Sequence, residues 1–103
     1  MENCINSFIE YWNNIDSILV EKHLDPETTV GGHRIHKFVE SINREDNYPC
    51  FSKDLAKFRI KDIHDDAVHY AKLYDIIDEY PFSDNEYIDF IGKIVDMKGV
   101  REQ

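Results

Sequence analysis

The sequence predicts an all-α fold, a single domain over residues 1–103 that forms a bundle of four or five helices. Apolar residues recur at three- and four-residue spacing in four segments, which is the periodicity of an amphipathic helix. Only four glycines and three prolines occur, and no dipeptide typical of a β-hairpin turn is present. The chain has the length of one domain, and its hydrophobic fraction of 42% is high enough for a packed core.

The first two predicted helices span about residues 2–23 and 30–44. The first ends before Pro26, because a proline disfavours the α conformation of the residue that precedes it. Gly31 and Gly32 weaken the start of the second, and residues 47–49 are predicted to form a loop. The apolar positions of the first helix are Ile5, Phe8, Ile9, Trp12, Ile15, Ile18 and Leu19, and those of the second are Ile35, Phe38, Val39 and Ile42.

The third and fourth helical segments both begin at a serine. Ser52 is a good N-cap residue, and the apolar rhythm that follows it continues as far as Pro81, in one helix or two. Residues 57–61 also alternate between polar and apolar, so a short strand is a competing interpretation there. The fourth helix opens with a capping box from Ser83 to Glu86 and is predicted to end near residues 98–99. Its apolar positions are Tyr87, Phe90, Ile91, Ile94 and Val95.

The charge of the chain restricts the partners that it can bind. The formal net charge is −9, and residues 61–103 contribute twice as much of it as residues 1–60. Binding to a nucleic-acid backbone depends on Lys and Arg, so the acidity argues against direct contact with nucleic acid. It argues equally against docking on an anionic membrane. A basic protein partner or a cation remains possible.

Cysteines and targeting signals indicate a cytoplasmic protein. Cys4 and Cys50 are too few for a disulfide framework, and either form one bridge or remain two reduced thiols. The amino-terminal residues lack the basic and apolar regions of a signal peptide, and no stretch approaches 18 apolar residues. We therefore expect a cytoplasmic protein that does not associate with membranes.

Tyrosines and carboxylates gather between residues 70 and 87, and we predict that they form a partner-binding surface. Tyrosine offers a large rigid ring with a polar tip, and carboxylates around it can pair with Lys and Arg of a partner. On the predicted helix, Asp75 and Asp78 share one face. The alternative is a solvated acidic face beside half-buried tyrosines. The predicted binding residues are Tyr70, Tyr74, Asp75, Asp78, Glu79, Tyr80, Asp84, Glu86 and Tyr87.

Residues 80–86, with the sequence Tyr-Pro-Phe-Ser-Asp-Asn-Glu, resemble the acidic, tyrosine-bearing recognition region of nuclease-colicin immunity proteins. Small acidic chains of this size are similar to the immunity proteins of bacterial toxin–immunity pairs. The resemblance implies a cytosolic inhibitor without enzymatic activity or cofactor. Its partner would be a basic cognate toxin such as a nuclease, whose phosphate-binding cleft suits an acidic protein.

The histidines suggest a metal site as another interpretation. His33 and His36 have i, i+3 spacing on a predicted helix. The third helical segment adds the possible ligands His64, Asp65, Asp66 and His69. The order of His33 or His36, then the His64-Asp65 pair, then Asp75, resembles the HD-domain phosphohydrolases, which implies a small metal-dependent hydrolase. That family places its His-Asp pair in an apolar helix, whereas residues 61–66 are mostly polar.

Two further functions fit the composition. A nucleic-acid mimic, such as an anti-restriction or anti-CRISPR factor, would share the acidity but would need carboxylates spaced along an extended surface. A structural assembly module would associate with itself through an apolar patch. No Ser or Cys nucleophile motif and no phosphate-binding glycine loop is present in the sequence, so we expect no enzymatic activity and prefer the acidic inhibitor.

Overall fold

The computed structural model describes residues 2–22, 30–43, 48–49, 52–98 and 100–101, and it confirms the all-α bundle. Four helices are present in these parts of the chain. They are α1 (Glu2–Glu21), α2 (Val30–Asn43), α3 (Lys53–Leu73) and α4 (Asp84–Lys98). The strand interpretation of residues 57–61 is wrong, because they lie within α3, where the apolar residues of α3 keep helical spacing against the core.

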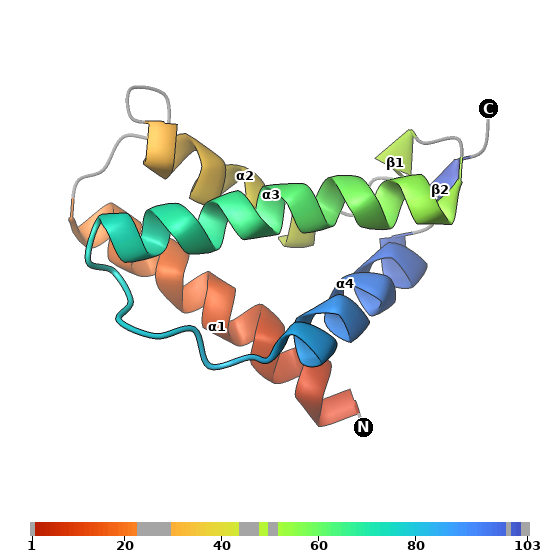
Figure 1. The fold of residues 1–103 in the computed structure, drawn as a ribbon, viewed down its shortest axis with the longest axis horizontal. Coiled ribbons are helices and arrows are strands. Elements are labelled where there is room, and N and C mark those ends of the chain that lie inside the picture. Colours follow the sequence, from red (N-terminus) through yellow and green to blue (C-terminus); the bar gives the residue numbers. More distant parts are fainter. Residues whose placement is uncertain (1, 23–29, 44–47, 50–51, 99, 102–103) are drawn as a thin grey trace.

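The long helix α3 is the centre of the bundle (Figure 1). Its most extensive contact is with α2, while α4 lies beneath its amino-terminal half and α1 crosses below it. The segment 74–83 leaves the far end of α3 and runs back toward α4 (Figure 1). None of the helices in the described parts is long and apolar enough to cross a membrane.

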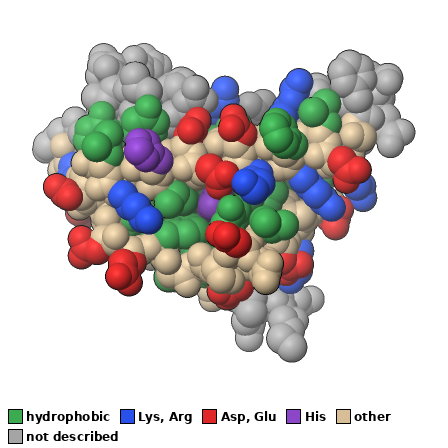
Figure 2. Space-filling model, viewed as in Figure 1, with side chains coloured by type: hydrophobic (Ala, Val, Ile, Leu, Met, Phe, Trp, Pro, Cys, Tyr) green, Lys and Arg blue, Asp and Glu red, His purple; other side chains and the backbone are tan. Residues whose placement is uncertain are grey.

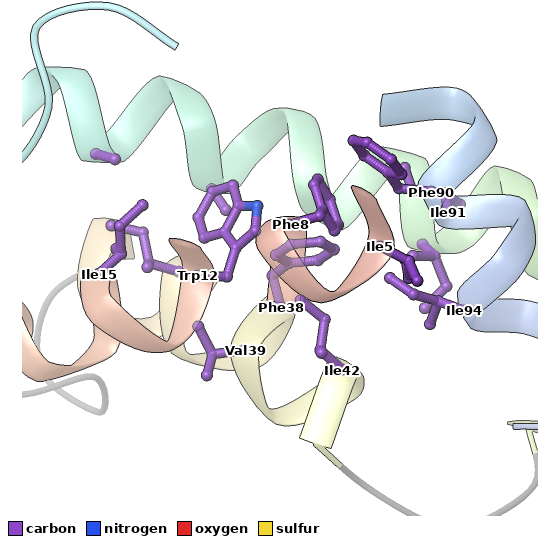
Figure 3. Packing of buried hydrophobic residues seen from close by; sticks show 14 of the residues in the cluster. Ile5, Phe8, Trp12, Ile15, Phe38, Val39, Ile42, Phe90, Ile91 and Ile94 are labelled. Atoms are coloured by element: carbon purple, nitrogen blue, oxygen red, sulfur yellow. The ribbon is translucent and has the colours of Figure 1, made fainter. Parts of the chain in front are cut away.

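The core is formed by most of the apolar positions that the sequence predicts for α1, α2 and α4, together with apolar residues of α3 (Figure 3). Trp12, Phe8 and Phe38 are its largest fully buried side chains. Ile9 and Tyr87 are only partly buried at its edge. Each helix contributes one apolar face, and the buried area of these faces stabilises the bundle. The buried apolar residues are Ile5, Phe8, Trp12, Ile15, Leu19, Ile35, Phe38, Val39, Ile42, Ala56, Ile60, Ala67, Ala71, Phe90, Ile91, Ile94 and Val95.

The carboxyl end of α3 differs from the prediction, because the helix ends at Leu73 and not near Pro81. Asp75 adopts a left-handed backbone with a φ of 58°. The N–H of Asp75 donates to the carbonyl of Lys72 at 3.1 Å, and the N–H of Ile76 donates to that of Ala71 at 2.9 Å. This pair of bonds is a Schellman motif, which ends a helix by satisfying its last carbonyls. Asp75 and Asp78 therefore do not share a helix face.

A two-residue parallel pairing was not predicted. β1 (Tyr48–Pro49) pairs with β2 (Val100–Arg101), so part of the predicted loop at 47–49 is bonded to the end of the chain. Two residues are too few to show alternation in the sequence, and the pairing depends on how the fold brings these segments together. The question of a cysteine bridge lies outside the described residues, because Cys50 and the side chain of Cys4 are not among them.

Candidate functional site

A buried histidine lies where α1, α2, α3 and the segment 74–83 meet. His64 on α3 is only 1% exposed and is the one buried polar side chain among the described residues. It stacks on the ring of Tyr87 with a centroid distance of 4.3 Å and an interplanar angle of 22°. The rings of Phe38 and Trp12 lie 5.2 and 5.7 Å from it. The imidazole is thus enclosed by aromatic side chains from three helices.

Both ring nitrogens of His64 have hydrogen-bond partners. Nδ1 lies 3.1 Å from a carboxylate oxygen of Asp65, and Nε2 lies 2.5 Å from the hydroxyl oxygen of Tyr80. An ionised carboxylate only accepts, so Nδ1 carries the proton and Nε2 accepts from the Tyr80 hydroxyl. Asp65 also accepts from Lys61 at 2.8 Å. We call Lys61, Asp65, His64 and Tyr80 the His64 network.

The surroundings fix the charges in the His64 network. Burial lowers the pKa of His64, although the nearby Asp65 opposes this effect. Burial also raises the pKa of the Tyr80 hydroxyl well above its usual value. For Asp65, burial acts to raise the pKa, but the hydrogen bonds from Lys61 and His64 outweigh it and lower the pKa overall. At neutral pH the network therefore contains a neutral imidazole, a neutral phenol and an ionised carboxylate.

The His64 network attaches the segment 74–83 to the bundle. Tyr80 and Phe82 from this segment pack against Tyr11 of α1, with centroid distances of 5.8 and 5.4 Å. Phe82 also lies 5.3 Å from Phe8. Because His64 is buried and both its nitrogens are occupied, it has no free atom with which to act on a substrate. The network is a structural anchor.

The nine residues predicted to bind a partner occupy two kinds of position. Tyr80 and Tyr87 are packed on His64, so neither ring projects freely as an anchor for a partner. Tyr70 and Tyr74 are half-buried at the end of α3. The carboxylates are exposed, and we call them the acidic segment. They are Asp75, Asp78, Glu79, Asp84 and Glu86.

The carboxylates of the acidic segment have no cationic partner within the described parts of the chain, although the Lys22 ammonium group donates to the backbone carbonyl of Asp75 at 3.3 Å. None of these five carboxylates forms an ion pair with a Lys or Arg there. The carboxylates of Asp65, Asp89 and Asp96, in contrast, are paired with lysines. Figure 2 shows acidic and basic side chains interspersed over the visible face. The acidic segment is therefore a run of five exposed carboxylates, close together in sequence, without an ion pair in the described parts of the chain.

Glu86 has a second role at the start of α4. Its carboxylate accepts from the N–H of Ser83 at 3.0 Å, while the N–H of Glu86 donates to the Ser83 hydroxyl at 3.3 Å. These reciprocal bonds confirm the predicted capping box. The box and the His64 network hold the acidic segment at both its carboxyl-terminal end and its middle.

The predicted metal ligands are not brought together in the described residues. No group of three His, Cys, Asp or Glu side chains in these parts of the chain could hold a metal ion. His64 uses both nitrogens within the protein, and His36 lies on the surface, 3.6 Å from Asp16. The side chain of His33 lies outside the described residues.

Sequence reasoning missed the anchoring role of His64, although a signal was available. His64 is four residues after Ile60 and three before Ala67, so it continues the buried face of α3. A histidine on such a face needs polar partners. Asp65 is adjacent in sequence, but Tyr80 is separated by 16 residues and only the fold brings it close.

We expect the substitution Tyr80→Phe to lower the free energy of unfolding by about 1–3 kcal/mol, because it leaves the buried Nε2 of His64 without a donor. Urea denaturation measures the change. Tyr70→Phe is the matched control, since the Tyr70 hydroxyl has no hydrogen bond among the described residues, and its effect should stay within about 0.5 kcal/mol. Equal losses in the two variants would contradict the role of the Tyr80–His64 bond.

Stability should also fall as the pH drops below the ordinary histidine pKa of 6.5. The pKa of His64 is lowered by folding, so below that value the unfolded chain binds a proton that the folded chain does not, and unfolding becomes more favourable. The lowered pKa of Asp65 causes a second loss of stability in stronger acid, below pH 3.8, the ordinary pKa of an aspartate. Urea midpoints at several pH values measure both. The substitution His64→Gln should remove the loss of stability below pH 6.5, whereas the exposed control His69→Gln should retain it. If His64→Gln left the pH dependence of stability unchanged, the assignment of this loss to His64 would be wrong.

Protein-family models, curated proteins and solved structures were compared with this chain, and none of them matches it.

Proposed function

We propose that this protein binds a basic protein partner through the acidic segment and inhibits it, as an immunity protein inhibits its toxin. One observation carries the proposal. Five exposed carboxylates without a cationic partner in the described residues lie on one short stretch, and that stretch is held by a buried hydrogen-bonded anchor.

The anchor favours binding by reducing its entropic cost. A segment that is already ordered loses less conformational freedom when a partner docks. Residues 74–83 contain no helix, yet Tyr80 and Phe82 pack against α1 and α3. Asp78 and Glu79 directly precede Tyr80, so the backbone that carries their exposed carboxylates is held beside this packed region.

The charge of the acidic segment favours a basic partner. Uncompensated charge on one side of a protein accelerates encounter with an oppositely charged surface and sets the orientation of docking. A nuclease cleft binds phosphates and is therefore basic, which makes a bacterial nuclease toxin a suitable partner. The resemblance of residues 80–86 to the recognition region of nuclease-colicin immunity proteins adds to this argument.

The distribution of carboxylates favours a dedicated inhibitor over a nucleic-acid mimic. A mimic needs negative charge repeated along an extended surface. Here Asp65, Asp89 and Asp96 of α3 and α4 are paired with lysines. Among the described residues, unpaired carboxylates such as Asp54 and Asp62 occur singly on α3, whereas the five of the acidic segment lie within residues 75–86. A cytoplasmic location is part of the proposal, because an immunity protein meets its toxin inside the cell.

The experiment is affinity capture from the source cell with tagged protein, washed at low and high salt, and identification of the retained proteins by mass spectrometry. We expect one basic protein that remains at high salt, because a shaped interface survives when long-range electrostatics are screened. Several nucleic-acid-binding proteins that are all lost as the salt rises would instead indicate mimicry. Capture of no protein at either salt concentration would contradict the proposal.

A further inference from the structure

A second surface lies between α3 and α4, and its lining includes no residue of the acidic segment, although Ile88 follows Glu86 by only two positions on α4. A cavity of about 110 Å³ opens there to solvent. Its lining is mainly apolar and is formed by Lys57, Phe58, Lys61, Ile88 and Ile91. Ile91 is buried and forms the floor, whereas Phe58 is 67% exposed and Ile88 is 49% exposed. We call this cavity the α3–α4 groove.

Two exposed apolar side chains beside one cavity differ from the scattered apolar residues of an ordinary surface. A large apolar side chain in water loses its contribution to stability, so an exposed pair at a concave site is typical of an interaction surface. The Lys53–Asp96 ion pair joins α3 to α4 close to the groove, at 3.2 Å. The groove is therefore part of the packed interface of two helices.

The α3 wall of the groove lies in the most basic part of the chain, whereas the α4 wall belongs to a helix with more acidic than basic residues. Residues 53–61 contain four basic residues and one acidic residue, in a protein whose net charge is −9. Lys57 lines the groove and has no ion pair with a described residue. The Lys57 side chain lies close to Gly92 of α4, because a Cβ atom at that position would be in ordinary contact with the Lys57 Cε atom, at 3.6 Å. An uncompensated ammonium group therefore lies beside an apolar cavity.

The size of the groove defines what can enter it. Sites for small molecules usually enclose about 300–1,000 Å³, so this cavity is too small for a typical cofactor or metabolite. A volume of 110 Å³ suits one aliphatic or aromatic side chain. The geometry fits the helix-in-groove mode of recognition, in which an apolar residue of a partner helix inserts between two helices.

From these observations we infer that the α3–α4 groove binds an acidic amphipathic helix of another protein. An apolar side chain of that helix occupies the cavity between Phe58 and Ile88, and a carboxylate one turn away pairs with Lys57. Charge complementarity selects this occupant. The inference goes beyond the proposed inhibitor function, because it concerns a partner of opposite charge and uses no residue of the acidic segment.

Other occupants fit the groove less well. A nucleic-acid strand would need several free cations, but Lys53 and Lys61 are already paired with Asp96 and Asp65. Two copies of this chain that met face to face through the groove would bring like charges together around Lys57. An acidic amphipathic helix supplies both an apolar side chain for the cavity and a carboxylate for the Lys57 ammonium group.

The test uses fluorescence anisotropy with the full chain and a capped, labelled helical peptide that carries one leucine flanked by glutamates one turn away. We expect this peptide to bind, and the substitutions Ile88→Ser and Lys57→Gln each to weaken binding about fivefold to tenfold. Both positions are on the surface of the groove. Val20→Ser and Lys37→Gln are matched controls at exposed positions outside the groove and should leave binding unchanged.

Four outcomes would overturn the inference. The first is absence of binding by the leucine–glutamate peptide. The second is equal binding by peptides with alanine for leucine or lysine for glutamate. The third is tighter, Lys57-dependent binding of a labelled single-stranded oligonucleotide. The fourth is dimerisation of the chain in sedimentation experiments that Ile88→Ser abolishes, because a second copy would then occupy the groove. None of these results depends on capture of the basic partner.

Discussion

The substitution Phe8→Ala should lower the free energy of unfolding by about 3–5 kcal/mol, far more than truncation of an exposed side chain. Phe8 is fully buried, and its ring lies beside rings from α2, α3, α4 and the segment 74–83. Its ring lies 4.8 Å from Phe90 of α4 and 6.2 Å from Phe38 of α2. It also lies 5.3 Å from Phe82, next to the acidic segment. Removal of the ring leaves a cavity where four helices and this segment meet.

Urea denaturation of the Phe8 variants measures this effect, with Val20→Ala as the control. Val20 is on the same helix but is 70% exposed, so its truncation should change stability by about 0.5 kcal/mol or less. The total stability of a domain is about 5–15 kcal/mol, so the alanine substitution alone can unfold the protein. In that case Phe8→Leu, which should cause a smaller loss of stability, is measured in its place. Similar losses for Val20→Ala and the Phe8 variants would contradict the arrangement of the core.

Reversal of three charges in the acidic segment should weaken binding to the captured basic partner about 100-fold. The variant is Asp78→Lys with Glu79→Lys and Asp84→Lys. One exposed ion pair contributes about 1 kcal/mol or less, but each reversal also adds repulsion, and three of them together reach the roughly 2.7 kcal/mol that a 100-fold change represents. Asp75 and Glu86 are left unchanged, because Asp75 has a φ of 58° and Glu86 caps α4.

A second triple variant controls for the change in net charge. Glu10→Lys with Asp54→Lys and Asp62→Lys alters three exposed carboxylates elsewhere by the same total charge. Asp54 is in the first turn of α3, as Asp84 is in the first turn of α4, so the two variants also lose similar helix-dipole interactions. Isothermal titration should show a far smaller loss in the control. Equal losses would mean that net charge, and not the acidic segment, governs binding.

Helical periodicity was sufficient to predict most of the fold. The predicted apolar positions of α2 are all buried, as are five of the seven in α1, because an amphipathic helix can bury only one face. The capping box at Ser83 was also predictable, since its bonds join residues three positions apart. These features depend on residues that are close in the sequence.

Features that depend on distant residues or unusual backbone angles were not predictable. The Schellman motif at the end of α3 places an aspartate where glycine is usual, so the apolar rhythm after Leu73 resembled a continuing helix. The bond between Tyr80 and His64 joins two elements whose proximity the sequence does not reveal. Tyr80 was consequently predicted to be a partner-binding residue, whereas its hydroxyl is occupied within the protein.

The most direct test of the acidic segment as the binding surface is amide hydrogen exchange of the whole chain, with and without the captured partner. We predict slower exchange within residues 74–86 in the complex, while the outward face of α1 around Glu10 is unchanged. The Asp78, Glu79 and Asp84 reversal variant should show little of this protection at the same partner concentration. Unchanged exchange within 74–86, together with new protection elsewhere, would contradict the account.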